Sequence, residues 1–240
     1  MKKIKIPVES NFITGRLLHP KIIKPNQPAL LLLHGWMSND SGNIKRAEEL
    51  IKLGFICLTI NFRGHGDSSG ELEKLSRQDH LNDAISAYDY LMSHDGIDKD
   101  KIGIIGTSYG SYIAVLLSIY RKIKWLVIRS PAIYNNDKFE EPSIKMIGKI
   151  ITKDYRLKKI IPLENKALNA ISEFMGEILL VESGNDELIP AQTIDNYKNS
   201  IYDKNKLTHI IILDADHSLS KPKWNNQFME ILIQWLKKRI

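Results

Sequence analysis

The fold is decided by residues 101–114, which read KIGIIGTSYGSYIA. The apolar run from Ile102 to Ile105 predicts a buried β-strand that passes directly into a Gly-x-Ser-x-Gly turn and then into a helix. Such a tight turn leaves no room for side chains at Gly106 and Gly110. It lifts the Ser108 hydroxyl above the sheet at a helix N-terminus, where backbone N–H groups can receive negative charge. Ser108 is therefore the candidate nucleophile, although glycine and serine are also common in ordinary turns.

Strand and helix signals alternate on both sides of this motif, which indicates a mostly parallel sheet with helices on both faces. The first two strands predict an antiparallel hairpin. The eight predicted strands are Lys2 to Val8, Phe12 to His19, Ala29 to Leu33, Phe55 to Ile60, Lys101 to Ile105, Trp125 to Ile128, Ile178 to Val181 and His209 to Leu213. The predicted helices between them are Asn43 to Leu53, His80 to Ser93, Tyr109 to Tyr120, Ala191 to Ser200 and Lys223 to Lys238.

One stretch interrupts the alternation. The 47 residues between Ser130 and Ile178 are too many for one crossover helix. From Pro142 to Ile151 the residues are apolar on nearly every side, which predicts a helix covered on more than one face. We expect residues 131–165 to form a small cap inserted into a single domain that spans residues 1–240, with Ile147 or Ile150 lining the substrate pocket. The alternative is an extra packing helix with no role toward substrate.

A serine hydroxyl needs a base to take its proton, and His217 is the candidate base among the seven histidines. It directly follows the last predicted strand, and catalytic groups of open α/β sheets gather at the carboxyl ends of the strands. Asp186 follows the preceding strand in the same way and is the candidate acid that orients the base. Its rivals are Glu187, which is adjacent, and Asp214 and Asp216, which crowd His217 in the sequence.

Acyl transfer also requires donors for the oxyanion of the tetrahedral intermediate. The backbone N–H of Tyr109, immediately after the nucleophile, is one candidate. The second is the N–H of Trp36, in the loop that follows the first buried parallel strand and begins with His34 and Gly35. An ordinary turn at the end of a strand is the alternative interpretation of that loop.

The chain resembles the α/β-hydrolase superfamily over nearly its whole length. The resemblance rests on five motifs in order, namely His34-Gly35-Trp36, Arg63 to Ser68, Gly106 to Gly110, Gly184-Asn185-Asp186 and Asp216-His217. It implies the order nucleophile, acid, base for Ser108, Asp186 and His217. Within the superfamily the chain looks like small esterases and serine-aminopeptidase-like hydrolases, including the cinnamoyl/feruloyl esterase group.

One residue departs from the family pattern. Relatives often have Asp two residues before the Arg-Gly-His-Gly turn, where this chain has Asn61. That position is structural in the family, and the turn from Arg63 to Ser68 is expected to shape a loop without acting in catalysis. The departure therefore leaves the three candidate catalytic residues unaffected.

The reaction predicted first is hydrolysis of a carboxylic ester with a small or aromatic acyl group, through an acyl-serine intermediate. Cleavage of an amide at a peptide N-terminus is the enzymatic alternative. It would need an acidic pocket, but residues 131–170 contain eight Lys and Arg against five Asp and Glu. Relatives with dehalogenase or epoxide hydrolase activity have Asp where this chain has Ser108. A non-catalytic binding protein on the same fold is the third possibility.

The composition of the chain narrows the classes of partner and the compartment that we expect for the protein. The net charge is +6, but the lysines are scattered and form no basic-aromatic stripe, which argues against nucleic acid. The longest apolar runs are far shorter than the roughly 20 residues that cross a bilayer. The single cysteine, Cys57, lies in an apolar run and indicates a buried thiol in a reducing compartment, so we expect a cytoplasmic protein. The substrate is a small-molecule ester, no metal or organic cofactor is expected, and the oligomeric state stays open.

Overall fold

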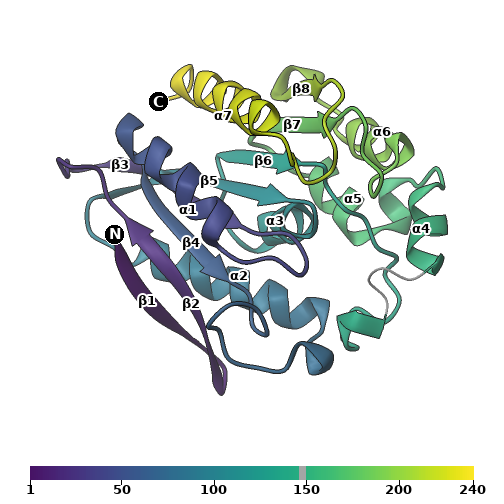
Figure 1. The fold of residues 1–240 in the computed structure, drawn as a ribbon, viewed down its shortest axis with the longest axis horizontal. Helices are drawn as coiled ribbons and strands as arrows, with labels where there is room; N and C mark the ends of the chain where they lie inside the picture. The colour runs from purple at the N-terminus through teal and green to yellow at the C-terminus, as the bar shows by residue number, and fades with distance from the viewer. Residues whose placement is uncertain (146–149) are drawn as a thin grey trace.

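The computed structural model describes residues 1–145 and 150–240. In these residues eight strands form one sheet in the order β1-β2-β4-β3-β5-β6-β7-β8 (Figure 1). β1 pairs with β2 and β2 with β4 in antiparallel fashion, and the remaining neighbours are parallel. The strands are β1 (Lys2–Val8), β2 (Asn11–Leu18), β3 (Gln27–Leu33), β4 (Ile56–Asn61), β5 (Ile97–Thr107), β6 (Trp125–Arg129), β7 (Glu177–Ser183) and β8 (Leu207–Ile212). The predicted sheet is confirmed.

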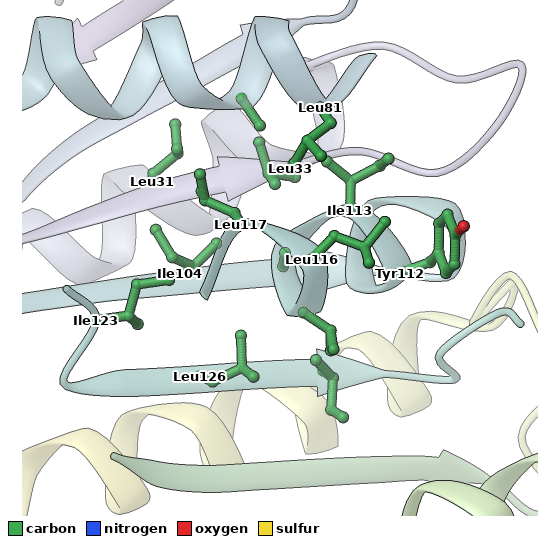
Figure 2. Close-up of a cluster of buried hydrophobic side chains, with 14 of the residues drawn as sticks. Leu31, Leu33, Leu81, Ile104, Tyr112, Ile113, Leu116, Leu117, Ile123 and Leu126 are labelled. Atoms are coloured by element: carbon green, nitrogen blue, oxygen red, sulfur yellow. The ribbon is translucent and has the colours of Figure 1, made fainter. Parts of the chain in front are cut away.

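Helices cover both faces of the sheet (Figure 1). The α1/α7 face is covered by α1 (Ser41–Leu50) and α7 (Pro222–Lys237), and the opposite face by α2 (Arg77–Met92), α3 (Tyr109–Tyr120), α5 (Lys166–Ser172) and α6 (Ala191–Ser200). Side chains of successive strand residues point to opposite faces. In β6, Leu126 and Ile128 therefore join the larger core, which Figure 2 shows in part, while Trp125 and Val127 join the core under α1 and α7.

The chain between β6 and β7 departs most from the prediction. The predicted helix from Pro142 to Ile151 lies partly outside the described residues. The described part has a short 3-10 turn at Ser143–Lys145 and the helix α4 (Ile150–Arg156), which extends past the predicted end. The sequence analysis missed α5, although Asn165 caps its first turn by accepting hydrogen bonds from the backbone N–H groups of Ala167 and Leu168.

Two other element boundaries differ for identifiable reasons. β5 begins at Ile97, four residues before the predicted start at Lys101, because Ile97 pairs with Gln27 ahead of a polar stretch that hides the strand in the sequence. α2 begins at Arg77, where Ser76 and Asp79 form a capping box that the apolar pattern does not reveal. No helix of the described residues is long and apolar enough to span a membrane.

Candidate active site

The turn between β5 and α3 holds Ser108 in a backbone conformation that non-glycine residues rarely adopt, with φ 53° and ψ −112°. A Cβ atom at Gly106 would lie 2.5 Å from the carbonyl oxygen of Gly110, and one at Gly110 would lie 2.5 Å from that of Leu33. Both glycines are therefore required by close backbone contacts. The backbone N–H of Ser108 donates to the carbonyl oxygen of Arg129 at 2.9 Å, which fixes the turn to the end of β6.

Ser108, His217 and Asp186 form one hydrogen-bonded chain. Nε2 of His217 lies 3.0 Å from Oγ of Ser108, and Nδ1 lies 2.8 Å from Oδ2 and 2.9 Å from Oδ1 of Asp186. The three residues come from loops after β5, β8 and β7, so they meet at the carboxyl edge of the parallel strands. Because the Asp186 carboxylate can only accept from Nδ1, the proton of a neutral His217 is held there, and Nε2 is left free to accept the serine proton.

The surroundings of Asp186 keep it ionised. Its partial burial would raise the pKa, but the hydrogen bond from His217 and those from the backbone N–H groups of Leu188 and Ile189 outweigh burial and lower the pKa of Asp186 below its usual value. A carboxylate that stays negative can stabilise the imidazolium that forms when His217 takes a proton.

The three rival carboxylates are placed elsewhere. Glu187 accepts from the backbone N–H of His217 at 3.3 Å and does not reach the ring. Asp216 accepts hydrogen bonds from the hydroxyl and the backbone N–H of Ser220, so it shapes the loop that carries His217. Asp214 lies in a turn at φ 60°. Among the described residues, Asp186 alone accepts a hydrogen bond from the imidazole of His217.

The loop after β3 lies against the nucleophile. A Cβ atom at Gly35 would lie 3.7 Å from Cβ of Ser108, so the residue has to be small for this approach. The backbone N–H groups of Trp36 and Tyr109 have no hydrogen-bond acceptor among the described residues. Two free donors beside Ser108 are what an oxyanion of acyl transfer requires. His34 stays neutral here, since burial lowers its pKa to about 3.

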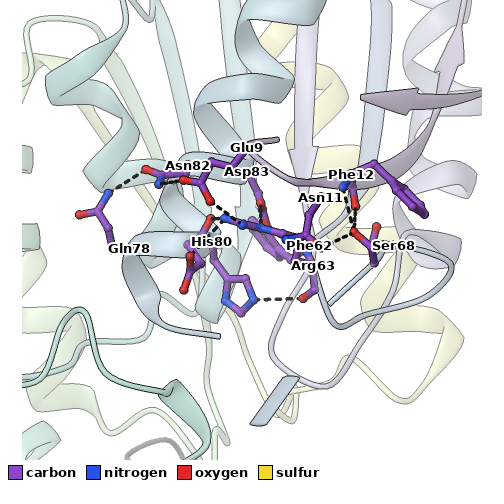
Figure 3. A network of polar contacts seen from close by, with 12 residues as sticks. Glu9, Asn11, Phe12, Phe62, Arg63, Ser68, Gln78, His80, Asn82 and Asp83 are labelled. Atoms are coloured by element: carbon purple, nitrogen blue, oxygen red, sulfur yellow. Dashed lines mark hydrogen bonds and ion pairs between the residues drawn. The ribbon is translucent and has the colours of Figure 1, made fainter. Parts of the chain in front are cut away.

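A polar network under the loop after β4 supports this edge of the site (Figure 3). Nε of Arg63 donates to Asp83 at 2.6 Å, and Nη1 donates to Glu9 at 2.9 Å. The carbonyl oxygen of Arg63 accepts from Nε2 of His80 at 3.2 Å, while Nδ1 of His80 lies 2.8 Å from the hydroxyl of Tyr109. Burial lowers the pKa of His80 to about 3, so its ring is neutral. The network thus links the Arg63 loop to the residue after the nucleophile.

Asn61 belongs to the same loop. Its side chain accepts from the backbone N–H of Asp40 at 2.8 Å and donates to Oγ1 of Thr14 at 3.3 Å. A Cβ atom at Gly66 would lie 2.6 Å from Cγ of Asn61, which explains why this position of the turn is glycine. The contacts of Asn61 are with the scaffold and not with Ser108, Asp186 or His217.

A cleft of about 1310 Å³ opens above Ser108. The segment between β6 and β7 contributes Tyr134 and, from α4 and its end, Thr152, Lys153, Arg156 and Leu157. The prediction for Ile147 falls outside the described residues, and that for Ile150 concerns a side chain that the structure does not describe. The sequence analysis missed Arg129, which lines the cleft. Its position at the carboxyl end of a buried strand was the available signal.

Known proteins resemble the chain in both sequence and fold. Residues 43–240 match the prolyl oligopeptidase family. An uncharacterized protein of Mycobacterium tuberculosis is 26% identical over 190 residues, which cover 79% of this chain and 63% of that protein, so the chain spans less than two thirds of this relative. A carboxylesterase of Bacillus subtilis is 23% identical over 228 residues, covering 83% of this chain and 92% of the esterase.

Among solved structures, Est1E of Butyrivibrio proteoclasticus with bound ferulic acid superposes with a TM-score of 0.78 at 17% identity and covers 98% of each chain. At this level of identity the likeness concerns the fold. Together with the strand order, it shows that the predicted α/β-hydrolase fold is correct.

Proposed function

The chain belongs to the prolyl oligopeptidase family of serine hydrolases, and from this premise we propose that it hydrolyses carboxylic esters through an acyl-serine intermediate on Ser108. The observation that carries the proposal is the hydrogen-bonded chain from Ser108 through His217 to Asp186. An esterase relative that matches 83% of this chain adds support.

In the proposed reaction, Oγ of Ser108 attacks the ester carbonyl carbon while Nε2 of His217 accepts its proton. The negative charge on the carbonyl oxygen is stabilised by the N–H groups of Trp36 and Tyr109, each worth about 3 to 4 kcal/mol in such sites. His217 then returns the proton to the departing alkoxide, which leaves as the alcohol. Water, activated by His217 in the same way, attacks the acyl-enzyme, releases the acid and restores Ser108.

For the acyl group we propose a small or aromatic carboxylic acid. Residues 131–165 would act as a short cap, since they bring Tyr134 and Leu157 to the wall of the cleft, which Leu188 also lines. The apolar and aromatic parts of these side chains suit a planar or short acyl group. Est1E, which shares the fold, binds ferulic acid, an aromatic acid of this kind.

Amide cleavage is the second candidate, and the match to a peptidase family favours it. Recognition of a free peptide N-terminus would require carboxylates that are buried beside Ser108. The glutamates of the cleft, Glu48, Glu49, Glu187 and Glu230, are all exposed. This arrangement supports ester cleavage over the release of N-terminal amino acids.

The test is labelling with a fluorophosphonate, followed by turnover of 4-nitrophenyl esters that vary in acyl length and aromaticity, beside aminoacyl 4-nitroanilides. We expect stable labelling of the wild type and none of Ser108→Ala. Ser111→Ala serves as the control, since this nearby serine is buried and its hydroxyl donates to the carbonyl oxygen of Arg129. Unlabelled wild type would point to a binding protein on the hydrolase fold, and faster anilide cleavage would point to a peptidase.

A further inference from the structure

The cleft above Ser108 continues into a groove between two helices on the α1/α7 face. Residues of α1 form one wall, including Asn43 and Arg46, and residues of α7 form the other, including Asn225 and Met229. Arg129 contributes to the same lining from the end of β6. The ester chemistry proposed above uses none of these residues, so the groove is available to the part of the substrate beyond the reacting bond.

Arg129 is 3% exposed and lies on the α1/α7 face, because the alternation that buries Trp125 and Val127 there continues to residue 129. Its Nη1 donates to the carbonyl oxygen of His217 at 2.7 Å. The guanidinium therefore lies directly beside the loop that carries the candidate base. Arg46 is half-buried, and its Nη1 donates to Oδ1 of Asn43 at 2.8 Å.

Three buried donors of this lining lack partners. Nε of Arg46, Nε of Arg129 and Nδ2 of Asn43 are all inaccessible to solvent and have no acceptor among the described residues. Neither arginine has an ion-pair partner in residues 1–145 and 150–240, which is also true of Arg16, Arg77 and Arg156, whereas Arg63 has three such partners and Arg121 has one. Buried donors and buried charges are normally paired, so these arginines are candidates to contact a ligand through the parts of their guanidinium groups that line the cleft.

The electrostatics favour an anion. Burial lowers the pKa of both arginines to about 10, and for Arg129 the neighbouring charge of Arg46 adds to the effect while the carboxylates of Asp186 and Asp216 oppose it. Both guanidinium groups remain charged at neutral pH and repel each other. Four exposed glutamates and two exposed lysines, Lys45 and Lys153, also line the cleft. Where Arg46 and Arg129 line it, the groove carries two positive charges.

We propose that Asn43, Arg46 and Arg129 form a subsite, here called the arginine subsite, that binds a carboxylate carried by the ester substrate. The planar guanidinium fork matches a carboxylate in geometry, and both arginines line the cleft that leads to Ser108. The inference rests on the proposed ester hydrolysis for its substrate class, and on the unpaired donors for its location.

The experiment uses two substrate pairs whose members differ only in whether a carboxylate is free or methylated. The first pair is 4-carboxyphenyl acetate and its methyl ester, with the carboxylate on the leaving group. The second is 4-nitrophenyl hydrogen adipate and its methyl ester, with the carboxylate on the acyl group. The measured quantity is kcat/KM of the free acid divided by that of the methyl ester, in wild type, Arg46→Gln, Arg46→Lys and Lys52→Gln.

For at least one substrate pair this ratio should fall tenfold or more in Arg46→Gln, because the KM of the free acid rises. The ratio should fall by a smaller factor in Arg46→Lys, which keeps the charge but loses the planar fork of the guanidinium. Lys52→Gln is the matched control, because Lys52 carries the same charge at the end of α1, is exposed and does not line the cleft. Its ratio should stay within twofold of wild type. If both pairs change by less than twofold in Arg46→Gln while the variant remains folded, the proposal is overturned; where that variant does not fold, Arg46→Lys decides on the same criterion.

A binding measurement separates this proposal from the proposed hydrolysis. Calorimetric titration of Ser108→Ala with 4-hydroxybenzoate and with adipate should give, for at least one of them, binding that weakens fivefold or more when Arg46→Lys is added. Binding of this kind without turnover of any ester would refute the proposed hydrolysis and support the arginine subsite. Ester turnover with unchanged ratios and no dependence of binding on Arg46 would refute the subsite and leave the hydrolysis standing.

Discussion

Arg63 and Arg129 are both almost fully buried, at 1% and 3% exposure, yet their surroundings are opposite. Arg63 donates to the carboxylates of Asp83 and Glu9 and to the carbonyl oxygen of Asp79. Arg129 has only neutral acceptors among the described residues, and its Nε has none. The paired charge of Arg63 is part of the scaffold, whereas Arg129, which lines the cleft without an ion-pair partner among the described residues, belongs to the proposed arginine subsite.

The largest expected effect is on ester turnover and concerns the candidate nucleophile in the cleft. Ser108→Ala should lower ester turnover by about 10⁴-fold or more, since removing one member of a cooperative catalytic unit removes most of its effect. The free energy of unfolding should change by no more than about 1 kcal/mol, because the variant removes one hydroxyl at the surface of the cleft. Steady-state kinetics and urea unfolding measure the two quantities. Comparable turnover in the variant would exclude Ser108 as the nucleophile.

The next largest effect concerns the scaffold arginine. Asp83→Asn leaves Arg63 buried without its main partner and should cost about 3 to 5 kcal/mol in the free energy of unfolding. Asp89→Asn is the matched control, because the side chain of Asp89, which pairs with Arg121, is 51% exposed. Losing this ion pair should lower the free energy of unfolding by at most about 1 kcal/mol. Equal costs for the two variants, from urea unfolding, would contradict the structural role assigned to the Arg63 network.

Acid should act on the scaffold through two neutral histidines. The pKa values of His34 and His80 are lowered to about 3 by burial, while in the unfolded chain histidine titrates near 6.5. Between these values each histidine binds more protons in the unfolded chain, so it lowers the free energy of unfolding by about 1.4 kcal/mol per pH unit as the pH falls. His65, whose pKa burial also lowers, acts in the same direction, whereas Asp83, whose pKa burial raises to about 7, acts in the opposite direction.

Urea unfolding at pH 6 and pH 5 measures this slope. The slope should be lower by about 1.4 kcal/mol per pH unit in His80→Gln, because His80 no longer contributes to it. His94→Gln is the control, since His94 is partly buried at the end of α2 and lies outside the Arg63 network. The slope of His80→Gln should be the shallower of the two. A wild-type slope retained in His80→Gln would mean that His80 is already protonated in the folded protein.

The smallest expected effect is on the free energy of unfolding and compares an arginine of the cleft directly with the scaffold arginine. Arg46→Met should change the free energy of unfolding by less than about 1 kcal/mol or increase it, because an unpaired and partly buried charge is replaced by an apolar side chain. Arg63→Met, the same substitution in the paired network, should cost about 3 to 5 kcal/mol because it leaves the buried Asp83 unpaired. If Arg46→Met proved as costly as Arg63→Met in urea unfolding, Arg46 would have a structural role that the unpaired donors do not suggest.

The sequence analysis was strongest where local pattern and chemistry coincide. The strands before Ser108, Asp186 and His217 are short apolar runs, and each run ends where a loop residue with catalytic potential begins. The structure brings these three residues together, although their catalytic role remains a proposal. The fold could be predicted because a hairpin is followed by six apolar runs, most of them separated by amphipathic helices, in a familiar order.

The features that could not be predicted depend on contacts between residues far apart in the sequence, which no local pattern encodes. The pairing of Arg63 with Asp83 joins residues 20 positions apart, and the contact between Arg129 and His217 joins residues 88 positions apart. The segment between β6 and β7 was hardest to predict, because its apolar residues could pack either on the domain or over the cleft. α5 was missed there, since seven residues are too few for a clear helical period.

The placement of that segment has an evolutionary consequence. β6 and β7 are parallel neighbours with a regular register from Trp125↔Glu177 to Arg129↔Val181, so the chain leaves and re-enters the sheet without disturbing either strand. Ser108, Asp186 and His217 all lie on other loops. Insertions, deletions and recombination between β6 and β7 can therefore remodel one wall of the cleft while the proposed catalytic residues keep their positions. This part of the molecule is where descendants of one ancestral hydrolase could diverge in substrate without first losing their chemistry.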